Sequence, residues 1–409
     1  MTMNPFFTCY ARTVQFILKS SMNFIEIRIP EVRDSLSSIP TLIKEHSLSH
    51  PLIVSGKHVS TLPKFSELVK SLKQKNLCFS VFNNVKSDPT FENIESLYQY
   101  YVDNGCDSII AIGGGSIIDA SKALGARIAR PKKSLASFRG LLKIGKDIPF
   151  FIAAPTTAGT GSEATLAAVI TNEKNGDKFA VNDPHLVPNV AVLDDSLLKS
   201  LPQKTIAITG IDALCHAVEA YIGRSNSKLT RKYALDSISL IYDNLLTFHQ
   251  NPQNDIARKK MLLASYYAGI SFTRAYVGYV HSLAHAIGGM YHLPHGYCIA
   301  ILLPYVLEAY GKKAFHSLGK INDRLMLSDP GAIDEEKALV TIEWIRNLNR
   351  SLSIPSSFDG AISEKDYERI AIHAYREAFP IYPVPRLLTI KELKKILIRA
   401  NTKTEENGK

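Results

Sequence analysis

The stretch Ser108-Ile-Ile-Ala-Ile-Gly-Gly-Gly-Ser116 decides the architecture of the first half of the chain. Isoleucines dominate its first five residues, which is typical of a strand that is buried on both faces. Three glycines then end the strand, and a helical pattern follows over Ile117–Ala129. Strand, glycine turn and helix in this order are the unit from which parallel α/β sheets are assembled.

The same alternation of apolar β-rich runs and helical patterns extends in both directions. Further strands are expected at Pro51–Ser55, Cys78–Phe82 and Phe150–Ala154, and further helices at Leu62–Lys73 and Asn93–Asn104. We therefore expect a Rossmann-like α/β domain over residues 27–200, with a mostly parallel sheet covered by helices on both faces.

The pattern changes after Pro202, where β-rich runs become rare and helical periods dominate. An all-α domain is therefore expected over residues 201–400, and a length of 409 residues also favours two domains. The expected helices are Thr205–Ile222, Lys228–Phe248, Asp255–Ala268, Tyr279–Gly288, Ala300–Tyr310, Glu335–Leu348, Ser363–Ala378 and Thr389–Ala400.

Both ends of the chain lie outside these two domains. Residues 1–26 form an N-terminal extension, for which a helix is expected because Val14 and Ile17 share one helical face. A mitochondrial transit peptide is the alternative, since no acidic residue precedes Glu26. Residues 401–409 are polar and are expected to form a flexible tail.

Composition restricts the classes of partner. Hydrophobic residues make up 45% of the chain and charged residues 21%, as in globular proteins. The net charge of +10 comes without a run of five Lys or Arg and without a nucleic-acid module, so no nucleic-acid partner is expected. Because no apolar run reaches roughly 18 residues, stable membrane insertion is not expected either.

The cysteines indicate the redox compartment. The five cysteines are odd in number, widely spaced and in no Cys-x-x-Cys pair. This distribution argues against a disulfide framework or a thiolate metal site and favours a reducing compartment. The expected location is the cytoplasm, with the mitochondrial matrix as the alternative for a eukaryotic source.

Two polar, glycine-containing loops each follow a strand of the expected sheet. Gly113–Ser116 offers glycines and the start of a helix, where backbone N–H groups favour an anion. Pro155–Glu163 offers threonine hydroxyls and free N–H groups. Either loop alone is compatible with an ordinary turn. Because the carboxyl ends of parallel strands meet at one edge, the pair predicts a phosphate or dinucleotide site there.

Five residues of the second half have the chemistry of metal ligands. Asp212 and His216 are four residues apart and share one helical face, as do His281 and His285. His295 follows in a segment, Leu-Pro-His-Gly, that is typical of a turn. Such a set suits Fe²⁺, Zn²⁺ or Mn²⁺, whereas the alternative is a helical core with hydrogen-bonded histidines. Spacing alone nominates five residues for about four positions and would pair His281 with His285.

The motifs together resemble the iron-containing, or group III, alcohol dehydrogenase family. The similarity runs from about Ile29 to beyond Leu303, and the order and spacing of the motifs agree. The family implies an N-terminal dinucleotide-binding domain and a helical domain, with the metal in the cleft between them; this is the dehydroquinate synthase-like fold. The matching segments are Ala111–Lys122, Pro155–Glu163, Thr209–Tyr221 and Val280–Pro304.

The resemblance implies roles for the five candidate ligands. By motif position, the family assigns the metal to Asp212, His216, His281 and His295, with Fe²⁺ as the first expectation and Zn²⁺ or Mn²⁺ as alternatives. His285 is then not a ligand; it matches the histidine beside the nicotinamide, a candidate for proton relay.

The resemblance also implies a set of residues that contact NAD(P). One position departs from the family: many members that prefer NAD carry Asp after the first strand, where this chain has Gly56. Because an Asp would repel the 2′-phosphate of NADP, Gly56 removes that repulsion and permits the use of NADP(H). The other implied cofactor-binding residues are Gly114, Gly115, Ser116, Asp119, Thr156, Thr157, Thr160, Thr165 and Lys178.

The sequence therefore predicts a metal-dependent, NAD(P)-linked alcohol dehydrogenase or aldehyde reductase, acting on a small alcohol or aldehyde. The family further implies a homodimer. Two alternatives are a lyase like dehydroquinate synthase, which needs several cations to hold a sugar acid, and a non-catalytic binding protein on the same fold. The four predicted ligands argue against the latter, because buried ligands without a metal are unfavourable.

Overall fold

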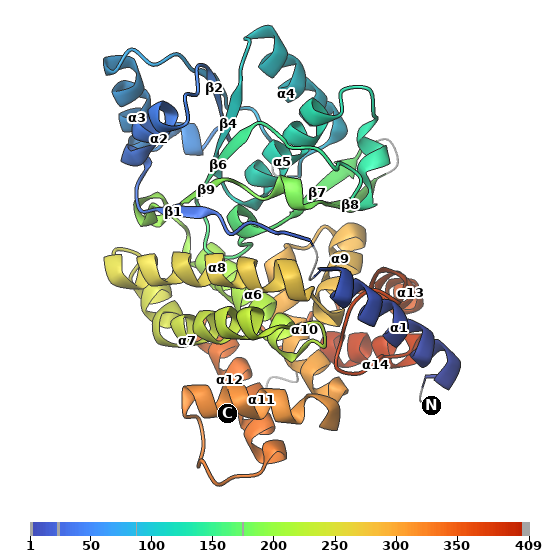
Figure 1. Ribbon diagram of the computed structural model, residues 1–409. Helices are drawn as coiled ribbons and strands as arrows, with labels where there is room; N and C mark the ends of the chain where they lie inside the picture. The colour runs from blue at the N-terminus through green and yellow to red at the C-terminus, as the bar shows by residue number, and fades with distance from the viewer. Residues whose placement is uncertain (1–2, 23–24, 87, 174–175, 403–409) are drawn as a thin grey trace. The chain divides into compact units, whose positions relative to one another are not determined.

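The computed structural model describes residues 3–22, 25–86, 88–173 and 176–402 (Figure 1). The chain forms two compact units. The α/β unit comprises residues 25–201 and 252–273, and the helical unit comprises residues 1–24, 202–251 and 274–409. The unit boundaries thus differ from the expected continuous ranges, since residues 252–273 return to the α/β unit.

Helix α8 (Asp255–Ala275) packs on the α/β unit because two backbones approach closely. A Cβ on Gly161 would lie 2.6 Å from the Ser265 carbonyl oxygen, and a Cβ on Gly269 would lie 2.5 Å from the Gly161 carbonyl oxygen. Gly161 also has a φ of +59°, in the left-handed region. The Leu166 N–H donates to the Thr273 hydroxyl at 2.9 Å. Hydrophobic periodicity could not reveal these contacts, which place α8 with the sheet.

The main sheet of the α/β unit is fully parallel, as the alternating pattern predicts. Strands β2 (Pro51–Ser55) and β4 (Ser108–Gly113) are buried along their whole length, consistent with helices on both faces. The order across the sheet is β1 (Glu31–Arg33), β9 (Val190–Val192), β6 (Phe150–Pro155), β4 (Ser108–Gly113), β2 (Pro51–Ser55) and β3 (Ser80–Phe82).

Helices and a second sheet complete this unit. Leu124 and Ala120 of α5 (Gly115–Ala129) pack in one apolar cluster with Ile109 and Phe151 of the central strands. The small sheet was not anticipated from the sequence. The strands of this small sheet are, in order, β5 (Gly140–Leu141), β8 (Asp177–Asn182) and β7 (Ala167–Asn172). The helices between the strands of the unit are α2 (Ile39–Glu45), α3 (Pro63–Gln74), α4 (Phe91–Asp103) and α5.

The second unit is helical throughout its regular structure. Two expectations need correction: α10 begins at its histidine and not at Ala300, and α11 was not predicted. The helices of this second unit are α1 (Pro5–Met22), α6 (Gln203–Ile222), α7 (Lys228–Gln250), α9 (Tyr279–Tyr291), α10 (His295–Tyr310), α11 (Lys312–Leu325), α12 (Asp334–Ser351), α13 (Tyr367–Ala378) and α14 (Ile390–Asn401).

Helix α6 is the central element of the helical unit. It packs against α7, α10 and α11. Among the described residues it is the one helix long and apolar enough to cross a membrane, but 83% of that window is buried inside the protein. Burial of this kind is ordinary for a core helix, and α6 carries the polar residues Asp212 and His216 in its interior face.

The N-terminal helix α1 is held by polar contacts with the segment that follows α13. The Arg12 guanidinium donates to the carbonyl oxygens of Val384 at 2.9 Å and Pro385 at 3.2 Å. The Gln15 amide donates to the carbonyl oxygens of Pro380 and Tyr382. These contacts make α1 part of the helical unit.

Candidate metal and cofactor sites

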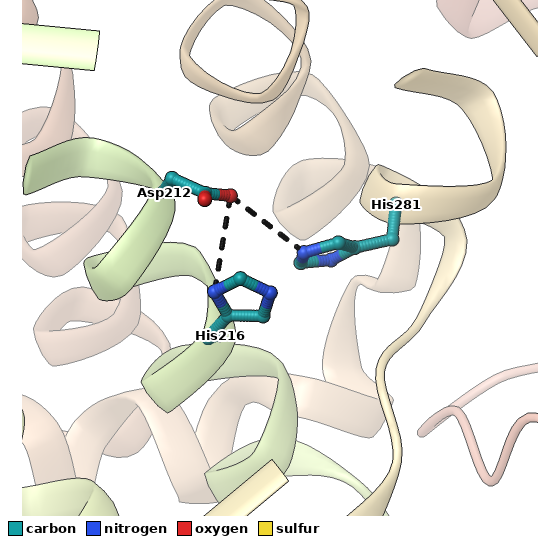
Figure 2. Close-up of side chains that lie close together, drawn as sticks. All are labelled: Asp212, His216 and His281. Carbon is teal, nitrogen blue, oxygen red and sulfur yellow. Dashed lines mark ion pairs between the residues drawn. The ribbon is translucent and has the colours of Figure 1, made fainter. Parts of the chain in front are cut away.

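Three of the predicted metal ligands converge in the interior of the helical unit. Asp212 and His216 lie one turn apart on α6, and His281 points toward them from α9 (Figure 2). The Asp212 Oδ1 atom lies 3.8 Å from His216 Nδ1 and 3.9 Å from His281 Nε2. All three side chains are buried. The structure therefore gathers one carboxylate and two imidazoles around one point.

The fourth predicted ligand reaches the same point from the start of α10. The Nε2 atom of His295 lies 3.6 Å from Asp212 Oδ1, and the imidazole is 38% exposed. His295 is the first helical residue after Pro294, whose carbonyl accepts the N–H groups of Tyr297 and Cys298. Because the other three side chains are buried, His295 marks the open side of the cluster.

The polar atoms of this cluster fit a divalent cation. The buried atoms Asp212 Oδ1 and His281 Nε2 have no hydrogen-bond partner, which is unfavourable for a protein interior. Burial raises the pKa of Asp212 to about 7 and, with a contribution from His285, lowers that of His281 to about 3. A metal ion removes both penalties, because it binds an ionised carboxylate and neutral imidazoles.

A buried glutamate that was not predicted from the sequence positions His281. Glu219 Oε2 lies 2.6 Å from His281 Nδ1, and the Glu219 carboxylate also accepts the N–H groups of Gly278 and Val280. With Nδ1 engaged, Nε2 is the nitrogen that faces Asp212. Glu219 lies three residues after His216 on α6, so helical spacing was the available signal.

A second unpredicted carboxylate holds His285. The Nδ1 atom of His285 lies 2.7 Å from Glu377 Oε1, which also accepts the Tyr382 hydroxyl at 2.8 Å. The His285 ring stacks on His295 with a centroid separation of 5.0 Å. His285 is therefore beside the cluster, partly exposed, and oriented by its own carboxylate. Glu377 is 92 residues away in sequence, so no local pattern could reveal it.

The two predicted cofactor loops lie together in the α/β unit. Gly113 pairs with Pro155 in the register of β4 and β6. Gly114 is the N-cap residue of α5, and a Cβ on Gly115 would lie 2.8 Å from the Thr160 side chain. The loops therefore meet at the carboxyl edge of the sheet, beside a helix N-terminus that favours a phosphate.

Three predicted residues with side-chain hydroxyls divide between partly exposed and buried positions. Thr157 is partly exposed and lies 3.6 Å from the position of a Cβ on Gly114. Thr156 is buried and its N–H donates to the Gly113 carbonyl. Ser116 is partly exposed in the first turn of α5. Thr157 and Ser116 thus present their side chains near the glycine turn, whereas Thr156 fixes the loop.

An internal network holds the threonine-rich loop in place. The Lys122 ammonium donates to the Thr165 hydroxyl and carbonyl and to the Ala167 carbonyl, all at 2.8 Å. Asp119 accepts the Ser162 hydroxyl at 2.6 Å and the Val169 N–H at 3.0 Å. Asp119 and Thr165, which the resemblance implies as cofactor contacts, therefore have internal partners that shape the loop. Sequence reasoning missed Lys122.

The last two predicted cofactor residues, Gly56 and Lys178, lie in different parts of the unit. A Cβ on Gly56, at the end of β2, would lie 3.5 Å from the Ile117 side chain in the first turn of α5. Gly56 is therefore near the glycine turn. Lys178 lies on β8, is exposed, and pairs with Asp88 at 2.7 Å.

Family models match both units of the chain. Residues 28–195 match the model described as "Iron-containing alcohol dehydrogenase", and residues 206–401 match "Fe-containing alcohol dehydrogenase family, C-terminal". Among solved structures, a 1,3-propanediol oxidoreductase aligns with a TM-score of 0.88 and 28% identity, covering 92% of this chain and 99% of its own.

Curated relatives are similar in sequence to this chain over most of its length. Alcohol dehydrogenase 4 of Saccharomyces cerevisiae is 33% identical over 84% of this chain and 89% of its own. The NAD-dependent methanol dehydrogenase of Bacillus methanolicus is 30% identical, covering 90% and 96%, respectively. The NADPH-dependent butanol dehydrogenase of Clostridium saccharobutylicum is 31% identical, covering 84% and 89%.

Proposed function

The chain belongs to the iron-containing alcohol dehydrogenase family, and we propose that it transfers hydride between NAD(P) and a small alcohol or aldehyde at the histidine cluster. The curated relatives described above are alcohol dehydrogenases, of which one is named NAD-dependent and one NADPH-dependent. The expected cofactors are therefore a nicotinamide dinucleotide and an iron-type metal. Neither the lyase nor the non-catalytic alternative has a counterpart among these relatives.

The observation that carries the proposal is the convergence of three histidines on Asp212 Oδ1. We assign the metal to this carboxylate and to the facing nitrogens of His216, His281 and His295. A divalent metal bound there supplies a Lewis acid for the substrate oxygen. His295 lies at the partly exposed side, so the substrate enters past this residue.

We assign proton transfer during the reaction to His285. The contact of Glu377 with His285 Nδ1 orients the imidazole and places the exchanging proton on Nε2. The Tyr382 hydroxyl, which also donates to Glu377, keeps that carboxylate in place. His285 is more exposed than the buried ligands, which suits a group that exchanges protons with solvent.

The dinucleotide is assigned to the loops of the α/β unit. Its phosphates are held at Gly114 and Gly115, where glycines permit close approach to the N-terminus of α5. Thr157, Thr160 and Ser116 supply hydroxyls at the same turn. Gly56 leaves space without negative charge beside this turn, so we propose that NADP(H) is accepted.

Two further assignments rest on expectation and have separate tests. A homodimer is proposed from the family, and light scattering of the purified chain tests it. A cytoplasmic location is proposed because Cys9, Cys78, Cys106, Cys215 and Cys298 are all free thiols, as in a reducing compartment. Fluorescence microscopy of a tagged chain checks the location.

The function is tested with the purified full-length chain loaded with Fe²⁺ or Zn²⁺. NADH and NADPH are each combined with short, branched and acid-bearing aldehydes. Oxidation of the cofactor is measured as the decrease in its absorbance. We expect turnover that depends on the added metal. His281→Ala is expected to abolish turnover and metal binding while leaving cofactor binding intact. Unchanged turnover in this variant would contradict the assignment of the site.

A further inference from the structure

A pocket of the helical unit, away from the histidine cluster, has a volume of about 480 Å³, within the range of small-molecule sites. None of its lining residues belongs to the histidine cluster. The end of α6 and Pro385 contribute apolar surface, and one face of α11 contributes polar side chains. The lining residues, all within the described part of the chain, include no Asp or Glu.

The charged residues of this pocket are cations, and three of them lack carboxylate partners among the described residues. Arg224, Arg231 and Lys313 line it, and no ion pair joins any of them to a carboxylate of the described residues. Lys320 also lines it and lies 3.2 Å from Asp323, but that carboxylate is shared with a second lysine. The pocket therefore carries a net positive charge.

These cations come from two segments, residues 224–231 and α11, which form the arginine wall and the opposite wall of the pocket. Lys313, His316, Ser317 and Lys320 follow each other at helical spacing along one face of α11. Of these, His316 lies 2.9 Å from Asp334, so this imidazole has an acidic neighbour. Across the pocket, the arginines come from the turn between α6 and α7 and from the first turn of α7.

A single amide organises the arginine wall. The Asn226 side chain donates to the carbonyl oxygens of Tyr221 at 2.6 Å and Gly223 at 2.7 Å, at the end of α6. It thereby covers the carbonyls that would repel an anion at a helix C-terminus. The Asn226 carbonyl accepts Arg231 Nη1 at 3.0 Å, which directs that guanidinium.

Two cations of α1 contact backbone carbonyls of the pocket lining and add to the positive potential there. Lys19 Nζ donates to the Arg224 carbonyl at 3.1 Å, and Arg12 donates to Pro385. Burial and the nearby Arg224 lower the pKa of Arg12 to about 10. Since like charges gathered around a concave surface attract a counter-ion, the pocket has the electrostatics of an anion site.

We propose that this pocket binds a small polyvalent anion, either a phosphate ester or a polycarboxylate. The arginines offer planar forks that match phosphate or carboxylate oxygens, and Lys313 offers a point charge from the opposite wall. Tyr221, Ile222 and Pro385, which are largely buried, form the apolar part of the lining. The site is separate from the proposed catalytic cluster and does not depend on its assignment.

The test is calorimetric titration of the metal-loaded full-length chain with two probes of different chemistry. Fructose 1,6-bisphosphate represents phosphate esters, and tricarballylate represents polycarboxylates. At least one probe is expected to bind with one-to-one stoichiometry, and the stronger of the two identifies the ligand class. Because the glycine turn of the α/β unit also suits a phosphate, the comparison of variants decides the location.

Arg224→Gln combined with Arg231→Gln is expected to weaken binding at least tenfold. Lys313→Gln changes one exposed side chain of α11 and is expected to weaken binding several-fold, even if the double variant fails to fold. Its matched control is Lys312→Gln, which neutralises the neighbouring exposed lysine outside the pocket. Absence of binding by both probes overturns the proposal, as does equal binding by Lys313→Gln and wild type.

Discussion

The carboxylate of Glu219 lies 2.6 Å from Nδ1 of His281 and orients that imidazole toward Asp212. Two backbone N–H groups, from Gly278 and Val280, hold the carboxylate in turn. A carboxylate behind a metal-binding histidine fixes the tautomer and increases the basicity of the ligand nitrogen. The relationship joins the central helix α6 to the start of α9.

Glu219→Gln is expected to lower metal affinity about 10- to 100-fold, as is usual when such a carboxylate is lost. The amide keeps the size of the side chain but removes the negative charge that holds the Nδ1 proton. Metal affinity is measured by competition with a chelator. Glu377→Gln is the matched control, because its carboxylate contacts His285 and not a proposed ligand. Equal metal affinities in the two variants would contradict the role of Glu219.

His285→Asn is expected to lower kcat by roughly 100-fold or more, within the range of general acid–base catalysis, while metal content stays near wild type. Glu377→Gln is expected to have a smaller effect on kcat, because it disturbs only the orientation of the imidazole. Steady-state kinetics and metal analysis on the same preparations separate these effects. Loss of the metal in His285→Asn would instead place this histidine among the ligands.

Local sequence patterns predicted the strand–helix alternation and the ligand helix, because both depend on residues near in sequence. Asp212 and His216 are one turn apart, and the glycine turn directly joins β4 to α5. The role of Glu377 depends on a contact between α9 and α13, which spacing cannot reveal. The placement of α8 similarly depends on the close approach of Gly161 and Gly269.

The buried carboxyl of Glu163 predicts a pH dependence of stability. Burial raises its pKa from 4.5 to about 7. Between these values the folded protein keeps a proton that the unfolded chain releases, so this group lowers stability as pH rises from about 4.5 to 7. Glu163→Gln removes this contribution, which is on the order of 3 kcal/mol. Its stability relative to wild type is therefore expected to increase across that range.

Urea unfolding at several pH values measures the effect of Glu163→Gln. The control is Glu335→Gln, in which the replaced carboxylate is exposed in the first turn of α12. This variant is expected to follow the wild-type pH profile. If the free energies of unfolding of Glu163→Gln and wild type ran parallel between pH 5 and 8, the carboxyl would not be the source of the pH dependence.

Gly115→Ala is expected to weaken binding of the dinucleotide at least tenfold. The new Cβ would lie 2.8 Å from Thr160 Cγ2 and 3.0 Å from its Oγ1, so the threonine-rich loop must shift away from the glycine turn. Adding Thr160→Ala to Gly115→Ala removes the atoms in conflict and is expected to restore part of the affinity. Fluorescence titration with NADH and NADPH measures both variants. Failure of the second change to help would show that the loop contact is not the cause.

Gly56→Asp is expected to raise the KM for NADPH at least tenfold and to change that for NADH little. The Cβ fits, because its nearest contacts are the Ile117 side chain at 3.5 Å and the Val85 carbonyl at 3.9 Å. The new carboxylate repels the 2′-phosphate, which NADH lacks. Gly56→Asn is the matched control of equal size without charge, and it is expected to retain most NADPH activity. Equal losses with Asp and Asn would indicate a steric effect, and a strong preference of the wild type for NADH would refute the role given to Gly56.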